Sequence, residues 1–563
     1  MAMLSDPASI APELERWVSD NVVDDFSKVL QLTNENKNDP PTEPYRSLYS
    51  AREFLSGIKG KMDSCPDELR AMEDFKIISS ALRLHLGLNY FNTDELGRAD
   101  EAFEASLRQL DGVSSKVKTA SLSVHAYNHL GVLWGNRSEQ QKALEYLLKS
   151  KAVYESHIAL PPPITDSQWL TGESVSEWER EKAFESLHTH TLFYLAQVFG
   201  NLKQVKQSAH YCQTTLSRQL EMKEYDAIEW SLNCATLSQY YISTEQFAQA
   251  RHCLAAATCM LEQYLSDSSS SDAESDPEGM LAEKIQQVKA DISRCWIKYC
   301  LGLLSASKDK QELEEAQSEQ PAAKRKLFKF EALEVADLEA AVPCDLIESF
   351  DGAKPVFFFC QKQIEAAKEY YTLNSFASDS VSITQDHSQL YKLVAFFETA
   401  IELKCRMHKR RVDMLTALLQ ELNRQHFLNV CRQLLYEVAE TQSEMASLKI
   451  VNASEDPSPH AVGKINKLLM SGVKYFENFV NSFVEQDANE LPDPISEDYL
   501  RPILCAKLHI ARLHSKVIYP DPAVQVRVCF LLQLMAYLML IIPLYVVVCR
   551  DLIFKKLWTT TLG

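Results

Sequence analysis

Two pairs of histidines are the first residues in this sequence whose types and spacing could do chemistry. His125 and His129 stand four residues apart, which on a helix brings two imidazoles within reach of one zinc ion. The residues between them, AYN, lack the glutamate of an HExxH motif, and no third ligand is evident, so we interpret the pair as packing histidines. His188 and His190 are two residues apart and would point to different faces of a helix. We therefore predict no metal site.

Catalytic and cofactor-binding motifs are missing from the sequence. It contains no G-x-S-x-G, phosphate-binding loop, dinucleotide-binding or kinase signature, and its 15 glycines in 563 residues leave few loops that could cradle a phosphate. An enzyme built on helical hairpins would need a metal or acid–base cluster, which we do not find. The sequence predicts a protein that is not an enzyme, uses no cofactor and acts by binding.

Charge and cysteine usage narrow the class of partner. The formal net charge of −19 argues against a nucleic-acid partner and favours partners with basic surfaces. The 14 cysteines form no CxxC pair, and the N-terminus lacks a basic region followed by an apolar core. We expect reduced core cysteines in a cytoplasmic protein.

The elements that must position any binding residues are helices. Few glycines and 21 prolines, with abundant Ala, Leu, Glu, Gln and Lys, favour an all-α fold. In LHLGLNYFNTDELGRADEAF, the residues Leu86, Gly87, Tyr90, Ala99 and Phe103 reproduce the L-G-x2-Y, A, x3-F spacing of a tetratricopeptide (TPR) unit. A glycine inside a helix costs about 1 kcal/mol relative to alanine. We therefore expect this glycine to lie where the second helix of a hairpin crosses the first.

The same pattern recurs three more times, with a small residue at the crossing and more than the regular 34 residues between units. The insertion LPPPITDSQWLTGESVSEW separates the second unit from the third. The sequence thus predicts a TPR-like α-solenoid of helical hairpins. The small packing residues of the later units are Gly131, Ala143, Ala196, Ser238 and Ala250.

Composition divides the chain into six segments. The stretch SDSSSSDAESDPEG interrupts the helices because its low hydrophobicity and clustered acid prevent burial, and a long helix follows it. The segments are 1–44, an N-terminal helix and connection; 45–265, an N-terminal TPR-like subdomain; 266–279, an acidic flexible loop; 280–306, a long linker helix; 307–522, a C-terminal helical subdomain; and 523–563, an apolar tail.

Three serines of the acidic loop are candidates for phosphorylation. Ser269, Ser271 and Ser275 each have an acidic residue three positions further on, which suits an acid-directed kinase. Phosphate would add charge to a loop that is already acidic.

The tail contains 22 consecutive uncharged residues, 528–549, bounded by Arg527 and Arg550. At about 1.5 Å per residue such a helix could cross a hydrocarbon core about 30 Å thick. We predict a transmembrane segment or membrane association there, with a buried helix as the alternative.

A basic cluster falls in a predicted helix of the second half. Two interpretations remain open: a docking patch, or a solvated helical face with acidic neighbours at Glu398 and Glu402. The cluster consists of Lys404, Arg406, His408, Lys409, Arg410 and Arg411.

A solenoid binds partners on the concave surface lined by the first helix of each hairpin. Four residues, Tyr194, Gln197, Gln219 and Thr236, combine an aromatic side chain with uncharged hydrogen-bonding groups in helices that could line this surface. They are our candidate binding residues.

Segments from about 40 to 520 resemble the KIF-binding protein family, a kinesin-binding TPR-like family. They include EPYRSLYSAREFL, LHLGLNYFNTDELGRADE, HTLFYLAQVFGNL, AHYCQTTLSRQLE, AIEWSLNCATLSQYYI, SRCWIKYCLGL, LVAFFETAIELKCRMHKRR and LRPILCAKLHIARLHSKVI. The resemblance implies two solenoid subdomains joined by a long helix around 292–304. It also implies a protein that grips kinesin motor domains and masks the surface that engages microtubules.

The resemblance further implies roles in axonal and organelle transport, microtubule organisation and neuronal differentiation, in a cytoplasmic, cytoskeleton-associated protein. Within the family, concave residues of the first subdomain contact the motor, and the matching positions are the same four candidate binding residues. After about Pro522 the sequence departs from the family pattern.

A membrane-anchored TPR co-chaperone or scaffold is the alternative, because the C-terminal tail is apolar. Such a co-chaperone needs a basic carboxylate clamp with asparagine directly after the crossing glycine of the first unit. Leu88 occupies that position.

Overall fold

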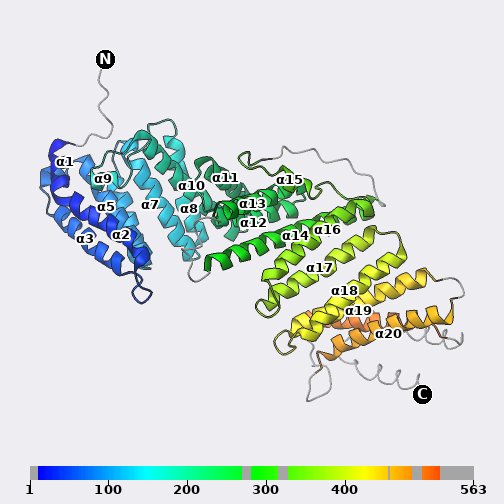
Figure 1. The fold of residues 1–563 in the computed structure, drawn as a ribbon. Helices are drawn as coiled ribbons and strands as arrows, with labels where there is room; N and C mark the ends of the chain where they lie inside the picture. The colour runs from blue at the N-terminus through cyan, green and yellow to red at the C-terminus, as the bar shows by residue number, and fades with distance from the viewer. Residues whose placement is uncertain (1–10, 269–279, 315–327, 454–456, 485–496, 520–563) are drawn as a thin grey trace. The chain divides into compact units, whose positions relative to one another are not determined.

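The computed structural model describes residues 11–268, 280–314, 328–453, 457–484 and 497–519, and the regular structure within them is entirely helical (Figure 1). The fold is an all-α, solenoid-like array of helical hairpins, which confirms the predicted fold class. The three candidate phosphorylation serines and the apolar segment 528–549 lie outside the described residues. No helix within these ranges is long and apolar enough to span a membrane.

The chain groups into two compact units. Unit 1 comprises the described residues up to Tyr240 together with Lys329–Glu334, and unit 2 comprises the rest. The boundary falls inside one helix, α12 (Ala227–Ser243). The six segments predicted from composition stay a prediction about where the chain could be divided.

Unit 1 ends within α12 and consists of consecutive helices, most of them joined by short turns, with a longer insertion over residues 158–176. It also has a short π-helix at Ser19–Val23 and a short 3-10 helix at Asn36–Asn38. Its remaining helices are α1 (Pro12–Val18), α2 (Asp24–Glu35), α3 (Arg46–Asp63), α4 (Asp67–Arg70), α5 (Glu73–Asn92), α6 (Leu96–Leu110), α7 (Lys116–Asn136), α8 (Gln140–His157), α9 (Gln168–Thr171), α10 (Glu177–Asn201) and α11 (Val205–Met222).

Unit 2 begins with the end of α12 and continues with longer hairpins, whose helices α16 to α20 follow one another side by side (Figure 1). Its helices are α13 (Phe247–Ser268), α14 (Met280–Glu314), α15 (Ala336–Ala340), α16 (Phe350–Tyr370), α17 (Ala377–Phe397), α18 (Ile401–Glu421), α19 (Leu428–Val451), α20 (Pro459–Asn481) and α21 (Glu497–Ser515).

Glycines bring the two helices of a hairpin into close approach in unit 1. A Cβ atom added to Gly87 of α5 would lie 2.5 Å from Cε1 of Phe103 on α6. One added to Gly131 of α7 would lie 2.6 Å from Cγ of Leu147 on α8. Real Cβ atoms do not approach neighbours this closely, so a side chain at either position would push the hairpin apart. The glycines are therefore required by helix packing.

Four hairpins close with the same turn. In the first, the backbone N–H of Glu95 donates to the carbonyl of Tyr90 over 2.9 Å, while Asp94 adopts a left-handed conformation with φ of 59°. This is a Schellman turn, which satisfies carbonyls left free at a helix end. The left-handed residues of the later turns are Ser138, Lys203 and Glu245. Their bonds end on the carbonyls of Trp134, Phe199 and Tyr241.

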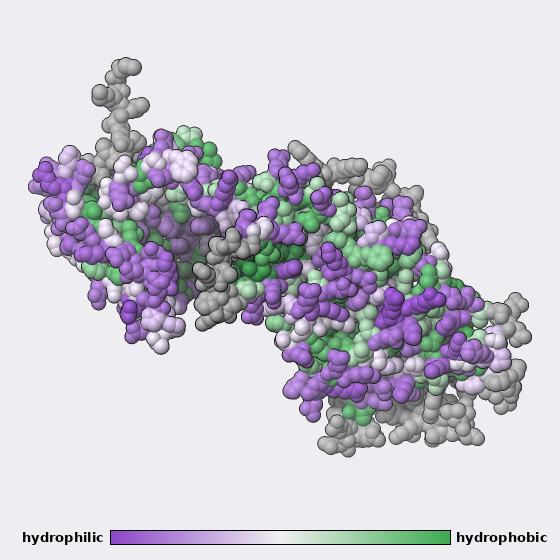
Figure 2. All heavy atoms as spheres, in the orientation of Figure 1, coloured by the Kyte–Doolittle hydropathy of each residue, from purple (hydrophilic) through white to green (hydrophobic). Residues whose placement is uncertain are grey.

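Hydrophilic side chains cover most of the face drawn in Figure 2, with hydrophobic ones gathered in smaller patches between them. Beneath this surface, each unit has its own apolar core. The core of unit 1 includes Phe26, Ile77 and Phe103, all fully buried, and that of unit 2 includes Leu415 and Phe476.

Candidate functional site

The four candidate binding residues lie on three successive helices of unit 1. Tyr194 and Gln197 are three residues apart on α10 and so share one face of that helix, and Thr236 is on α12. Both of these are first helices of their hairpins. Gln219 instead lies on α11, a second helix. Gln197 and Thr236 are exposed, whereas Tyr194 and Gln219 are half-buried.

Local contacts hold two of these side chains, those of Tyr194 and Thr236, in place. The ring of Tyr194 packs edge-on against Phe193, with 5.3 Å between centroids, and burial raises the pKa of its phenol, so it stays a hydrogen-bond donor at neutral pH. The hydroxyl of Thr236 donates to the carbonyl of Leu232 over 2.9 Å, which leaves its oxygen free to accept. The four candidate residues therefore supply one aromatic ring and neutral hydrogen-bonding groups on three successive helices.

A capping box starts the helix that carries two of these residues. The hydroxyl of Ser176 accepts from the backbone N–H of Glu179 over 3.3 Å, and the carboxylate of Glu179 accepts from the backbone N–H of Ser176 over 3.0 Å. These bonds satisfy N–H groups that a helix start leaves unpaired. They fix where α10 begins.

A polar network behind the candidate residues was not predicted from the sequence. Arg218, next to Gln219, pairs with Glu185 of α10 and donates to the hydroxyl of Thr189 over 3.2 Å. The phenol of Tyr154 donates to Glu185 over 2.7 Å, and burial, followed by this carboxylate, raises its pKa to about 12. The network ties α8 and α11 to α10. An arginine and a glutamate 33 residues apart give no sequence signal that they meet.

The histidine pairs lie in packed surroundings. His125 contacts Asp166 of the insertion between α8 and α10, with 3.0 Å from Nδ1 to Oδ2, and His85 lies 3.7 Å from the same oxygen. Burial raises the pKa of Asp166, but the hydrogen bond from His125 and the two histidines outweigh burial and leave it lowered. His129 stacks on Phe91, with centroids 5.6 Å apart.

His188 is buried against Tyr154 with centroids 3.5 Å apart, whereas His190 is exposed. Across the described ranges, no group of three histidine, cysteine or acidic side chains could hold a metal ion.

The basic cluster of the second half separates in unit 2. Arg411 is 2% exposed and forms ion pairs with Glu437 and Glu444, at 3.4 and 3.1 Å. His408 is buried beside it, 3.0 Å from Nδ1 to the guanidinium. Arg406, Lys409 and Arg410 are exposed, and Lys404 is half-buried. The cluster is thus partly core and partly surface. Neither of the two interpretations from the sequence, a docking patch or a solvated helical face, describes such an arrangement.

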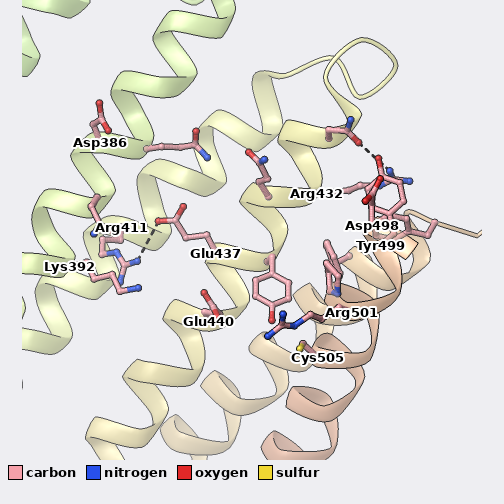
Figure 3. A pocket seen from close by; sticks show the side chains of 18 residues that line it. Asp386, Lys392, Arg411, Arg432, Glu437, Glu440, Asp498, Tyr499, Arg501 and Cys505 are labelled. Atoms are coloured by element: carbon pink, nitrogen blue, oxygen red, sulfur yellow. Dashed lines mark hydrogen bonds and ion pairs between the residues drawn. The ribbon is translucent and has the colours of Figure 1, made fainter. Parts of the chain in front are cut away.

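A groove of about 920 Å³ opens beside this buried arginine, between α17, α19 and α21. Figure 3 shows Lys392 and Arg411 at one end, Arg432 and Tyr499 at the other, and Glu437 and Glu440 between them. Arg432 lies 3.6 Å from the ring centroid of Phe483 and donates to the carbonyl of Ser482 over 2.8 Å. Burial raises the pKa of Glu440. This groove carries charges of both signs.

Comparison with known sequences identifies the family. A sequence model described as "KIF-1 binding protein C terminal" matches residues 228–534, more than half of the chain. The match continues beyond Pro522, the point after which we expected the sequence to depart from the family. KIF-binding protein of Gallus gallus is 37% identical over 516 residues, covering 86% of each chain.

The same similarity extends to other animals. KIF-binding protein of Homo sapiens is 36% identical over 565 residues, covering 89% of each chain. That of Drosophila melanogaster is 31% identical over 534 residues, covering 90% of this chain and 89% of its own. These relatives are named as binding proteins, not as enzymes.

A solved structure supports the same assignment. The structure described as "Cryo-EM map of KIFBP" superposes with a TM-score of 0.61 at 30% identity, covering 92% of this chain and 90% of its own. Sequence and fold agree over nearly the whole chain. The chain therefore belongs to the KIF-binding protein family.

Proposed function

We propose that this chain binds kinesin motor domains through the face formed by α10, α11 and α12, and that binding keeps the motor off microtubules. Relatives that align over almost the full length carry the name KIF-binding protein. The observation that supports the location is the set of four neutral side chains, Tyr194, Gln197, Gln219 and Thr236, presented by three successive helices.

Charge supports the proposed mechanism. A motor must present a basic face to acidic tubulin, and a chain with a net charge of −19 can compete for that face. Neutral hydrogen-bonding residues would then set register and specificity, while the long-range field would speed encounter. Microtubules are an indirect partner in this scheme, and the protein acts in the cytoplasm on the cytoskeleton, in axonal and organelle transport and in neuronal differentiation.

The test replaces the four candidate residues together by alanine in the full chain. We expect loss of motor binding by at least about 100-fold, because central contact residues each contribute about 2 kcal/mol or more. Binding is measured with purified motor domains by biolayer interferometry, and microtubule attachment by co-sedimentation. Circular dichroism verifies that the helices remain.

A matched control replaces surface residues of the same types elsewhere in unit 1, and we expect it to bind like the unchanged chain. These residues are Gln31, Thr33, Tyr49 and Gln141, which are exposed and lie on α2, α3 and α8, outside the proposed face. Undiminished binding by the candidate variant would refute the location. Binding that leaves the motor attached to microtubules would refute the proposed mechanism.

A further inference from the structure

A second groove, of about 640 Å³, lies in unit 2 and is lined by α14, α17, α18, α19 and α21. It adjoins the groove of Figure 3, since Gln389 and Lys392 line both. Its charged lining is almost entirely basic. The cations are Lys308, Lys392, Lys404, Arg512 and Lys516.

The one carboxylate in this lining does not balance them. Glu444 is already engaged with the buried Arg411, at 3.1 Å, and with His408, at 3.5 Å. The negative charge of Glu444 therefore already compensates the buried Arg411 and is not available to the lysines of the groove. The groove keeps a positive surplus inside a chain whose net charge is −19.

The lining cations have few partners of their own. Lys516 donates to the neutral hydroxyl of Ser447 over 3.0 Å. Lys308 pairs with the exposed Glu312 at 3.5 Å and lies over the ring of Phe396, 5.6 Å from its centroid. The remaining three, Lys392, Lys404 and Arg512, have no carboxylate within 4 Å among the described residues.

The charges of these cations affect the pKa values of neighbouring groups in the groove. Burial, followed by the charge of Arg512, lowers the pKa of Lys516. Burial lowers the pKa of His408 to about 4; Glu444 opposes this shift, while Arg411, Lys392 and Lys404 add to it. Positive charge that converges in a concave, partly desolvated site concentrates anions there.

Apolar side chains share the groove with the cations. Phe396, Leu448 and Val451 all line the groove; Phe396 is half-buried and Val451 is 76% exposed. A phosphate ion would leave this apolar surface exposed to water. A peptide with alternating acidic and apolar side chains can cover the apolar surface and at the same time pair its carboxylates with the cations.

We propose that this basic groove binds an acidic peptide segment of a partner protein, with apolar side chains between its carboxylates. The adjoining groove shows the contrast, because its lining includes Asp386, Glu437, Glu440 and Asp498 among its cations. Of the two adjoining grooves, the basic one is therefore the one that would favour an acidic ligand. This proposal does not depend on the proposed motor binding, which we place on helices of unit 1.

The test measures fluorescence anisotropy of a fluorescein-labelled peptide of about ten residues that alternates glutamate and leucine, long enough to span such a groove in extended form. The variant combines Lys392→Ser, Lys404→Ser and Arg512→Ser in the full chain. The control combines Arg406→Ser, Lys409→Ser and Lys467→Ser, which removes three exposed cations of unit 2 outside both grooves.

We expect the groove variant to weaken peptide binding at least about tenfold, because three ion pairs with the peptide are lost together, and the control to stay within about twofold. Equal weakening by both variants would overturn the proposal, as would equally tight binding of a peptide with glutamine in place of glutamate. The affinity of the unchanged chain for the peptide must also fall as the salt concentration rises, because salt screens charge pairs. An affinity that does not change with salt would overturn the recognition of acidic groups.

Inorganic polyphosphate and a glutamate–serine peptide separate the two kinds of anion. Weaker binding of both than of the glutamate–leucine peptide supports the peptide assignment. If both bind as tightly and lose as much affinity in the groove variant, the site takes simple anions and the peptide assignment is wrong.

Discussion

Two contacts between neighbouring helices, one in each unit, depend on different kinds of interaction. In unit 1, Gly87 and Gly131 remove a side chain, so that Phe103 and Leu147 of the facing helices fill the space. In unit 2, the space between α17, α18 and α19 holds the guanidinium of Arg411. One contact depends on shape and the other on charge.

The difference has consequences for what each region can do. An apolar crossing needs no partner beyond itself and excludes water, so it repeats easily along a solenoid. A buried arginine needs several acceptors, and Arg411 takes them from Glu437, Glu444 and the hydroxyl of Ser388. Carboxylates used in this way no longer neutralise cations nearby, and the basic groove follows.

The largest effect is expected from breaking the charged contact. Arg411→Ala should lower the free energy of unfolding by about 3 kcal/mol, because it leaves a cavity and two partly exposed carboxylates without their cation. Urea unfolding, with hydrogen exchange of peptides from α18 to α20, measures the loss. Arg406→Ala, exposed on the same helix, serves as the control and should stay within about 0.5 kcal/mol. Similar losses for both would contradict a structural role for Arg411.

Breaking the shape-dependent contact should cost less. Gly87→Ala places a Cβ against the ring of Phe103 and should destabilise by about 2 kcal/mol, despite the better helix propensity of alanine. Gly60→Ala in α3 has nothing within 4 Å and should stabilise by about 0.5–1 kcal/mol. Thermal and urea unfolding compare the two. If both variants are stabilised, the close crossing at Gly87 is not required.

A pH titration sharpens the comparison within unit 1. Burial, followed by repulsion from His125 and His190, lowers the pKa of His129 to about 3, with Asp166 opposing. Because the unfolded state, with a pKa near 6.5, binds the proton first, stability is lost as pH falls below about 6.5. At pH 5.5 this histidine should account for about 1.4 kcal/mol of loss relative to pH 8.

His129→Phe keeps a ring against Phe91 and removes the titrating group. Urea unfolding at pH 8 and pH 5.5 should show a smaller pH difference for this variant than for the unchanged chain. An identical difference in the two proteins would mean that this histidine is not buried in its neutral form.

Much of the fold could be predicted from the sequence because its signals are local. Helix-forming composition and the spacing from Gly87 to Phe103 lie within one hairpin, and the structure places these two residues in contact. The repeated turns at Asp94 and Ser138 carry no glycine, so they gave no turn signal. The sequence did not show that Gln219 lies on the second helix of its hairpin, because this depends on where each individual helix begins and ends.

The parts that could not be predicted depend on residues far apart in the chain. Asp166 reaches His125 across 41 residues, and Glu444 reaches Arg411 across 33. A sequence shows which charges exist but not which of them will be desolvated together. From the sequence we therefore treated the basic residues at 404–411 as a single cluster, although folding buries some of them and exposes the others.

The sequence by itself determined the helical hairpins and the family, because periodic apolar spacing and the segments that resemble the family are properties of the chain alone. Only the tertiary structure decided where the charges act. It buried Arg411 with the acids that would otherwise balance its neighbours, and left Lys392, Lys404 and Arg512 around one groove. The physical reason is that electrostatic partnership is set by distance and burial in space, which sequence spacing does not encode.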